Sequence, residues 1–101
     1  MIVDVKENES DLTVKLNGRF DTEAAYKNAA NFDNLVTKSH KPIFLDFTKM
    51  VYICSSGLRL LLTLHKKLLV AGRQLTILHP NEAVKDVFKI TGFNKLLNIK
   101  D

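Results

Sequence analysis

A short apolar segment near the middle of the chain constrains the fold more than any other feature. Pro42 precedes residues 43–47, which read Ile-Phe-Leu-Asp-Phe, so almost every residue of the segment is apolar. A strand of this composition has to be covered on both faces, as the inner strands of parallel sheets are. The segment therefore predicts a fold of the α/β class, with this strand at the centre of a sheet.

The beginning of the chain shows the alternation of apolar and polar residues that is typical of strands with one solvent-exposed face. Residues 2–7 and residues 12–16 both alternate in this way. The polar residues 8–11 between them are too few for a crossover connection, so the two strands have to be antiparallel. The chain is therefore expected to begin with a β-hairpin, which ends at the break Asn17-Gly18.

Three later segments have apolar residues at the spacings of three and four that predict amphipathic helices. The first begins at Asp21 or Thr22, either of which can cap it, and the second runs from about Gly57 to Val70. The third lies between Pro80 and Gly92. The inner faces of the three helices are expected to consist of Ala25, Ala29, Phe32 and Val36, then Leu58, Leu61, Leu62, Leu68 and Leu69, and finally Ala83, Val84, Val87 and Phe88.

Two further strands, at residues 74–78 and 96–99, complete the predicted sheet. The order of elements is then β-β-α-β-α-β-α-β, and every strand–helix–strand step implies a parallel, right-handed connection. The expected fold is a small mixed β-sheet of the α/β class, with an N-terminal antiparallel hairpin followed by parallel βαβ units. A length of 101 residues fits a single domain, residues 1–101.

Composition excludes several classes of protein. Apolar residues make up 46% of the chain, but no apolar run approaches the roughly 20 residues of a membrane helix. The N-terminus lacks the pattern of a secretion signal and Cys54 is the single cysteine, so a reducing cytoplasm is the expected location. His40, His65 and His79 are too far apart in sequence to suggest a zinc site, and no glycine-rich phosphate loop suggests a cofactor.

The net charge of +4 raises the possibility of a small basic nucleic-acid-binding domain. The basic residues are scattered, however, as at Arg19, Arg59 and Arg73, and the aromatic residues do not alternate with them. A solvated surface explains this distribution better than a nucleic-acid face does, so no nucleic-acid partner is expected.

A turn is predicted at residues 48–57, beyond the carboxyl end of the central strand, where function gathers in open α/β sheets. Its last residues, Ile-Cys-Ser-Ser-Gly, have four interpretations. In the first, Ser55 or Ser56 caps the following helix and Gly57 allows close approach of the backbone. In the second, Cys54 and Arg59 act as in a cysteine phosphatase, although the loop between them is one residue too short for that class.

The third interpretation, a serine nucleophile, lacks the Gly-x-Ser-x-Gly elbow and any acid or histidine at a recognisable spacing. The fourth is a phosphorylation site. A serine at a helix N-terminus can hold a phosphate, because free amides and the helix dipole offset its charge. The added charge would repel a partner whose interface covers that serine.

Four motifs, in order along the chain, resemble those of STAS domains, the family named for sulfate transporters and anti-sigma-factor antagonists. Residues 45–58 are similar to the family's strand that ends in Asp and leads into Asp-Ser-Ser/Thr-Gly-Leu at the start of a helix. Residues 16–21 resemble its earlier Leu-x-Gly-x-Leu/Ile-Asp motif. Residues 71–75 and 90–93 match its later glycine-containing turns, so the resemblance covers essentially the whole chain.

The resemblance implies a stand-alone bacterial anti-sigma-factor antagonist that is not itself an enzyme. In that family, a serine kinase of the anti-sigma type phosphorylates the serine that corresponds to Ser55, and a serine phosphatase restores it. The unphosphorylated antagonist binds the kinase, and the phosphorylated form does not. The partner-binding surface that the resemblance implies consists of Asp21, Ser55, Ser56, Gly57, Arg59 and Thr63.

One residue departs from the family's pattern. Cys54 stands where the family usually has Asp, so the residue before Ser55 lacks the usual negative charge. An alternative hypothesis keeps the fold without the switch. In that case the domain is a non-phosphorylated interaction subunit of a larger signalling or transport complex.

Overall fold

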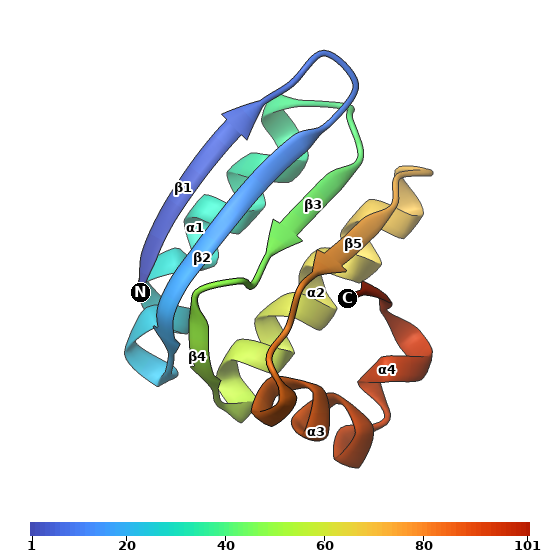
Figure 1. Cartoon of the computed structure of the whole chain (residues 1–101). Coiled ribbons are helices and arrows are strands. Elements are labelled where there is room, and N and C mark those ends of the chain that lie inside the picture. Colours follow the sequence, from blue (N-terminus) through green and yellow to red (C-terminus); the bar gives the residue numbers. More distant parts are fainter.

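The longest strand of the sheet, β2 (Leu12–Phe20), pairs with three neighbours. The computed structural model describes all residues, 1–101. On one side β2 pairs antiparallel with β1 (Ile2–Glu7), which confirms the predicted hairpin. On its other side it runs parallel to β3 (Ile43–Asp46) and then to β4 (Met50–Ile53), as Figure 1 shows.

The remaining strands extend the sheet beyond β3. Strand β5 (Leu75–Leu78) pairs parallel with β3, and β6 (Asn98–Lys100) pairs parallel with β5. The order across the sheet is β1-β2-β3-β5-β6, so β1 and β6 are its two edges. The predicted mixed sheet, with parallel units after the hairpin, is therefore confirmed. The last strand begins two residues later than expected, because a short helix, α4 (Phe93–Leu96), precedes it.

Strand β4 was missed by the sequence analysis, which placed a turn over residues 48–57. Both β3 and β4 pair with β2, and the pairing slips between them. Lys15 lies opposite Asp46, whereas Gly18 lies opposite Met50 and Phe20 opposite Ile53. The segment from the start of β3 to the end of β4 thus contains two more residues than the part of β2 that lies beside it. Strand β2 bends to accommodate them.

Gly18 is the residue at which β2 bends. Its φ of +103° lies in the region that glycine adopts without strain. Its N–H donates to the carbonyl of Lys49 at 2.8 Å, so it still takes part in the sheet. The break predicted at Asn17-Gly18 is therefore a bend inside a nine-residue strand rather than its end.

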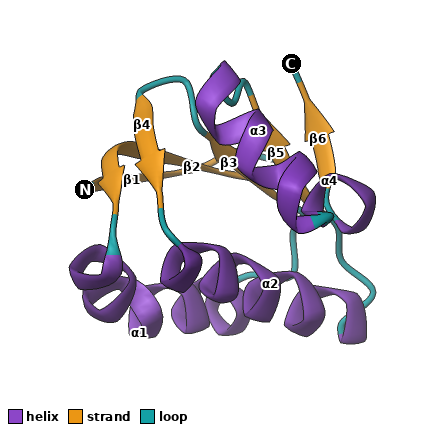
Figure 2. Cartoon of the chain, turned by 90° about the horizontal axis from the view of Figure 1, so that it is seen from below, coloured by secondary structure: helices purple, strands orange, loops and turns teal.

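Two long helices cover one face of the sheet. Helices α1 (Thr22–Lys38) and α2 (Ser55–Val70) lie side by side in one layer, as Figure 2 shows. Helix α3 (Glu82–Thr91) lies outside that layer and packs against β4. The central strand is covered as its composition predicts, since Ile43, Leu45 and the following Phe47 are fully buried.

The inner face of α1 differs from the predicted stripe. Ala25 and Phe32 are buried as expected, but Ala29 is exposed, and Asn28 and Leu35 take the inner positions. Asn28 can be buried because its side-chain amide donates to the Ala24 carbonyl one turn earlier, at 2.8 Å. A polar residue that is satisfied within its own helix is not visible in a hydrophobic pattern.

In α2 the buried side chains are Leu58, Leu61, Leu64 and Leu68. The predicted Leu69 is instead 59% exposed, and Leu62 is only half-buried. Leucines occur at so many successive positions of this helix that spacing alone does not distinguish the inner face. In α3 the predicted Val84 and Phe88 are buried, whereas Ala83 is exposed.

Arg73, which the sequence analysis assigned to the solvated surface, is only 8% exposed. Its guanidinium donates twice to the carbonyl of Lys41, at 2.9 and 2.7 Å, and once to that of Val36, at 2.8 Å. Val36 belongs to the last turn of α1, whose carbonyls have no partner within the helix. Arg73 therefore fixes the C-terminal end of α1 to the start of β5, and its burial lowers the pKa of the guanidinium.

We expect Arg73→Lys to lower the free energy of unfolding by about 1–3 kcal/mol, because an ammonium group cannot bond both carbonyls in the geometry of a guanidinium. Urea denaturation followed by circular dichroism measures this change. The matched control is Arg59→Lys, at an exposed position of α2, which should change stability by less than about 0.5 kcal/mol. Equal effects of the two substitutions would show that the buried contacts of Arg73 do not stabilise the fold.

Candidate functional site

The N-termini of α1 and α2 meet at one end of the sheet. Phe20 and Ile53 are paired at the ends of β2 and β4, and the Cys54 N–H donates to the Phe20 carbonyl at 3.0 Å. Each helix begins directly after its strand. The Thr22 hydroxyl of α1 consequently lies 3.8 Å from the Cys54 sulfur. The first-turn amides of two helices therefore lie at the same end of the molecule, at the lower left in Figure 1.

The two helices are capped differently. Asp21 is the N-cap of α1, and its carboxylate accepts a hydrogen bond from the Ala24 N–H at 2.9 Å. Cys54 is the N-cap of α2, which begins at Ser55. The interpretation that Ser55 or Ser56 caps this helix is therefore wrong, because both serines lie inside its first turn. A thiol is a weaker acceptor than a carboxylate, so the amides at the start of α2 are less well satisfied than those of α1.

The Cys54 thiol has a pKa below its ordinary value. Partial burial raises the pKa, but the nearby amides of Gly57 and Ser56 and the hydroxyls of Thr22 and Ser56 favour the thiolate and outweigh it. The first turn of α2 therefore favours a negative charge at its N-terminus, even on a weak acceptor.

Ser55 is the first residue of α2 and is exposed, whereas Ser56 is half-buried. No acidic residue occurs in the first turn of this helix. A phosphate on Ser55 would lie beside unpaired amides at the positive end of the helix dipole. Ser55 is thus exposed to a modifying enzyme, and its surroundings would stabilise the negative charge of a phosphoserine.

Gly57 is buried beneath the two serines. A Cβ atom at this position would lie 3.0 Å from the Phe20 ring and 3.1 Å from the Ile53 side chain. Glycine therefore lets the first turn of α2 rest directly on the ends of β2 and β4. The residue supports the surface from below, and its side-chain position is not available to a partner.

Arg59 and Thr63 continue the exposed surface that begins at Ser55. The three residues are spaced by four, so they form one stripe along α2, and all three are exposed. The Thr63 hydroxyl donates to the Arg59 carbonyl at 3.0 Å within the helix. Asp21, at the start of α1, is half-buried. The structure thus brings Asp21, Ser55, Ser56 and Gly57 together at one end of the molecule, with Ser56 partly and Gly57 wholly beneath the surface. Arg59 and Thr63 lie about one and two turns further along α2.

A pair of residues that the sequence analysis missed lies on the strands that lead to this end of the sheet. The Arg19 guanidinium lies 4.3 Å from the centre of the Tyr52 ring, a cation–π contact between β2 and β4. Tyr52 and its neighbour Val51 are 40% and 59% exposed, just before Cys54. The signal that could have found them is the run Val-Tyr-Ile at residues 51–53, which favours a strand over a turn.

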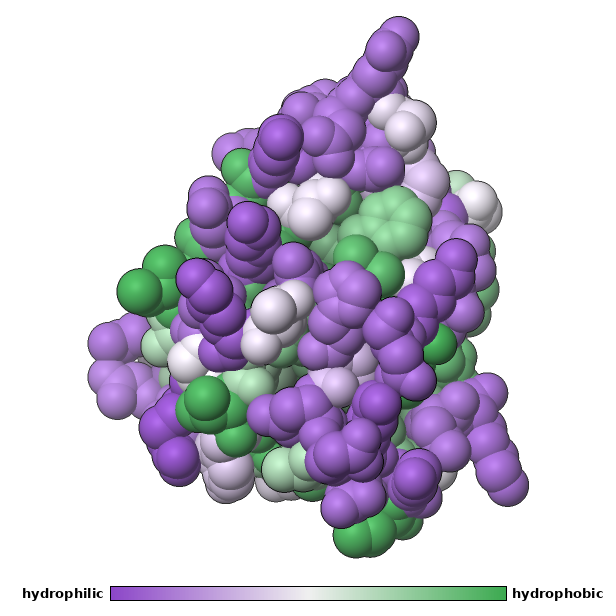
Figure 3. Space-filling model, viewed as in Figure 1, coloured by the Kyte–Doolittle hydropathy of each residue, from purple (hydrophilic) through white to green (hydrophobic).

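No group of three His, Cys, Asp or Glu side chains in the chain is close enough to hold a metal ion. None of the helices has the length and apolar character needed to cross a membrane. The face shown in Figure 3 is mainly hydrophilic, with scattered hydrophobic residues. The strongest candidate for the functional site is the meeting point of α1 and α2, because it exposes Ser55 at a helix N-terminus beside the start of a second helix.

The fold and the motif at the start of α2 are those of a STAS domain. The model of that family matches residues 3–101, so the chain belongs to the STAS domain family. The resemblance drawn from the four motifs is thus confirmed.

Solved structures with this fold include several anti-sigma factor antagonists. A protein of Thermotoga maritima assigned to that class is 24% identical, with a TM-score of 0.90, and the match covers 98% of this chain and 86% of that one. The antagonist SpoIIAA in its unphosphorylated form is 19% identical, with a TM-score of 0.78 and coverage of 99% and 88%. Phosphorylated SpoIIAA from Bacillus is 18% identical, with a TM-score of 0.75 and coverage of 97% and 90%. These likenesses establish the fold.

Alkylation of Cys54 by iodoacetamide should reach half its maximal rate at a pH below the ordinary thiol pKa of about 8.5. In Thr22→Val the profile should shift to higher pH, because the hydroxyl that stabilises the thiolate is removed. Because the folded-state pKa is the lower one, thiolate formation stabilises the fold as pH rises from the folded to the unfolded pKa. That contribution is lost as pH falls through the folded pKa.

The control for the alkylation profile is the same protein in urea, where the thiol should titrate normally in both variants. Identical profiles for the folded wild type and Thr22→Val would contradict the assigned contact.

Proposed function

We propose that this protein is an anti-sigma-factor antagonist, a binding module that is switched off by phosphorylation of Ser55. The observation that carries the proposal is the exposed Ser55 at the first position of α2, within the family's motif, on a surface shared with the start of α1. In the unmodified state the surface binds an anti-sigma factor that is also a serine kinase. A serine phosphatase reverses the modification, and the system operates in the cytoplasm.

The charge environment supports such a switch. A phosphate adds a charge of about −1.5 to −2, and the unpaired amides of α2 offset it locally. Cys54 differs from the usual Asp in that it can remain neutral. A phosphate next to it would raise the thiol pKa through like-charge repulsion, so the two charges need not coexist. The substitution therefore reduces the electrostatic cost of phosphorylating Ser55.

The same geometry explains how the modification would release a partner. A kinase docked on Ser55, Arg59 and Thr63 would have to bury a phosphate against a surface that already includes Asp21. Desolvation of the phosphate and its repulsion by acidic groups of the partner both oppose binding. The helix itself need not unfold, so the switch acts on the surface and leaves the fold intact.

A non-enzymatic role agrees with the position of Cys54. In a cysteine phosphatase, the residues between the cysteine and the arginine wrap around one phosphate. Here residues 55–58 form the first turn of α2, and Arg59 belongs to an exposed stripe of that helix. This arrangement favours a binding module over a thiol enzyme.

Phosphosite mapping of the protein isolated from its own cells is the most direct test. We expect phosphate on Ser55 in a proportion that differs between growing and stressed cells. Ser55 unmodified in every state would favour the alternative of a constitutive interaction subunit, with the STAS fold retained and the switch lost.

Ser55→Asp should weaken binding to the purified cognate kinase at least about tenfold, equivalent to about 1.4 kcal/mol, whereas Ser55→Ala should bind as the wild type does and accept no phosphate. Isothermal titration calorimetry measures both affinities. Ser10→Asp is the matched control, because it adds the same charge at an exposed serine in the β1–β2 turn, at the opposite end of the sheet. Wild-type affinity in Ser55→Asp would disprove exclusion by charge.

A further inference from the structure

The edge strand β1 has backbone groups that are free to pair with another strand. The Asn8 N–H donates to the Asp11 carbonyl, and the Leu12 N–H donates away from β1, to the Pro42 carbonyl. Successive residues of a strand point their backbone groups to opposite sides. Residues 2, 4 and 6 therefore face β2, whereas the N–H and C=O groups of Val3, Val5 and Glu7 point outward from the sheet.

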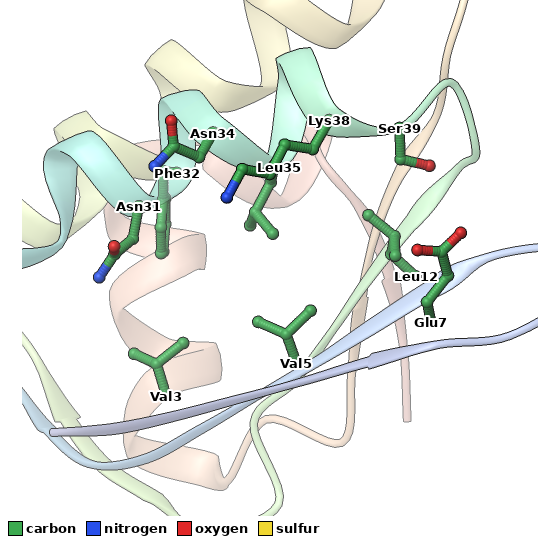
Figure 4. Close-up of a pocket in the computed structure, with 10 residues that line it drawn as sticks. All are labelled: Val3, Val5, Glu7, Leu12, Asn31, Phe32, Asn34, Leu35, Lys38 and Ser39. Carbon is green, nitrogen blue, oxygen red and sulfur yellow. The ribbon is translucent and has the colours of Figure 1, made fainter.

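The side chains of the same three residues line a groove. Figure 4 shows Val3, Val5 and Glu7 on the side of β1 that faces α1, below Leu35 and Lys38. The groove has a volume of about 460 Å³ and opens at the edge of the sheet. Val5 is 49% exposed there, and Ile2, on the other side of the strand, is 70% exposed. An open edge thus coincides with incompletely covered apolar side chains.

We propose that β1 pairs with β1 of a second copy of this chain, antiparallel and centred on Val5, to form a two-fold symmetric dimer. The inference is independent of the proposed phosphorylation. In this register Val5 faces Val5 of the second copy, and each Val3 faces Glu7 of the other copy. All these pairs use the outward-pointing backbone groups, so the register forms a continuous ladder of hydrogen bonds.

Charge selects this register over its neighbours. With Val5 at the centre, Asp4 of each copy lies directly opposite Lys6 of the other, in the closely spaced pairs between the hydrogen-bonded ones. A shift that centres the dimer on Asp4 places two carboxylates opposite each other. A shift that centres it on Lys6 places two ammonium groups opposite each other. The register centred on Val5 is therefore the one of the three with opposite charges in contact.

The groove side of the dimer is also compatible with this register. Each Glu7 would lie opposite an apolar Val3, and its carboxylate already has a partner, since Lys41 Nζ contacts it at 2.8 Å. The two Val5 side chains cover each other at the mouths of the two grooves. Binding of a second copy consequently buries apolar surface without burying an unpaired charge.

Charge reversal tests the register. We expect the wild type to sediment with about twice the monomer mass of 11.4 kDa at low salt. Asp4→Lys and Lys6→Asp should each raise the dimer dissociation constant at least about tenfold, because each places like charges opposite each other twice. The double variant Asp4→Lys/Lys6→Asp should restore the dimer, since it re-creates both opposite-charge pairs.

A backbone variant provides a second test that spares the monomer. Val5→Pro removes an outward N–H that β2 does not use, so the fold should persist while the dimer is lost. Val5→Thr keeps that N–H and should remain dimeric, and circular dichroism checks the fold of both. A wild type that is monomeric at about 1 mM protein, or single charge variants that dimerise like the wild type, would overturn the proposal. Failure of the double variant to dimerise would overturn the register.

Discussion

The parallel pairing of β2 with two successive strands is the interaction on which the rest of the molecule depends. Because the segment from the start of β3 to the end of β4 contains two more residues than the part of β2 beside it, β2 has to bend, and Gly18 provides the conformation for that bend. The bend brings Phe20 and Ile53 level at the end of the sheet. Because each helix begins directly after its strand, α1 and α2 then start next to each other. The motif at residues 16–21, which contains Gly18, and the motif at residues 45–58, which contains Ser55, are therefore two parts of a single geometric arrangement.

The site is made by backbone more than by side chains. Its features are the free amides of a helix N-terminus, a glycine that lets the helix rest on an aromatic ring, and a cap that is weaker than usual. Such a site can accept or release a negative charge with little rearrangement, because the dipoles that stabilise the charge are already in place. Cys54 fits this description, since the same amides that would face a phosphate already lower the pKa of its thiol.

The sequence predicts the fold well where hydrophobic periodicity and chain connectivity act together. The hairpin follows from two alternating segments and a short turn, and the central strand follows from an apolar run. The prediction fails where a residue's burial depends on local hydrogen bonding or on a bend. Strand β4 has two exposed residues in its middle, Val51 and Tyr52, so it does not alternate. Asn28 is buried because its own helix satisfies it, and the cap of α2 falls on a cysteine rather than on a serine.

The two ends of α1 are held by different contacts. At its C-terminal turn the buried guanidinium of Arg73 bonds the Val36 carbonyl, and it also bonds Lys41 in the loop that follows. At its N-terminal turn the Asp21 carboxylate caps the helix, and Thr22 contacts Cys54 at the start of α2. Each end of α1 is thus fixed by a different part of the chain, so a displacement of this helix would have to break contacts at both ends of the sheet.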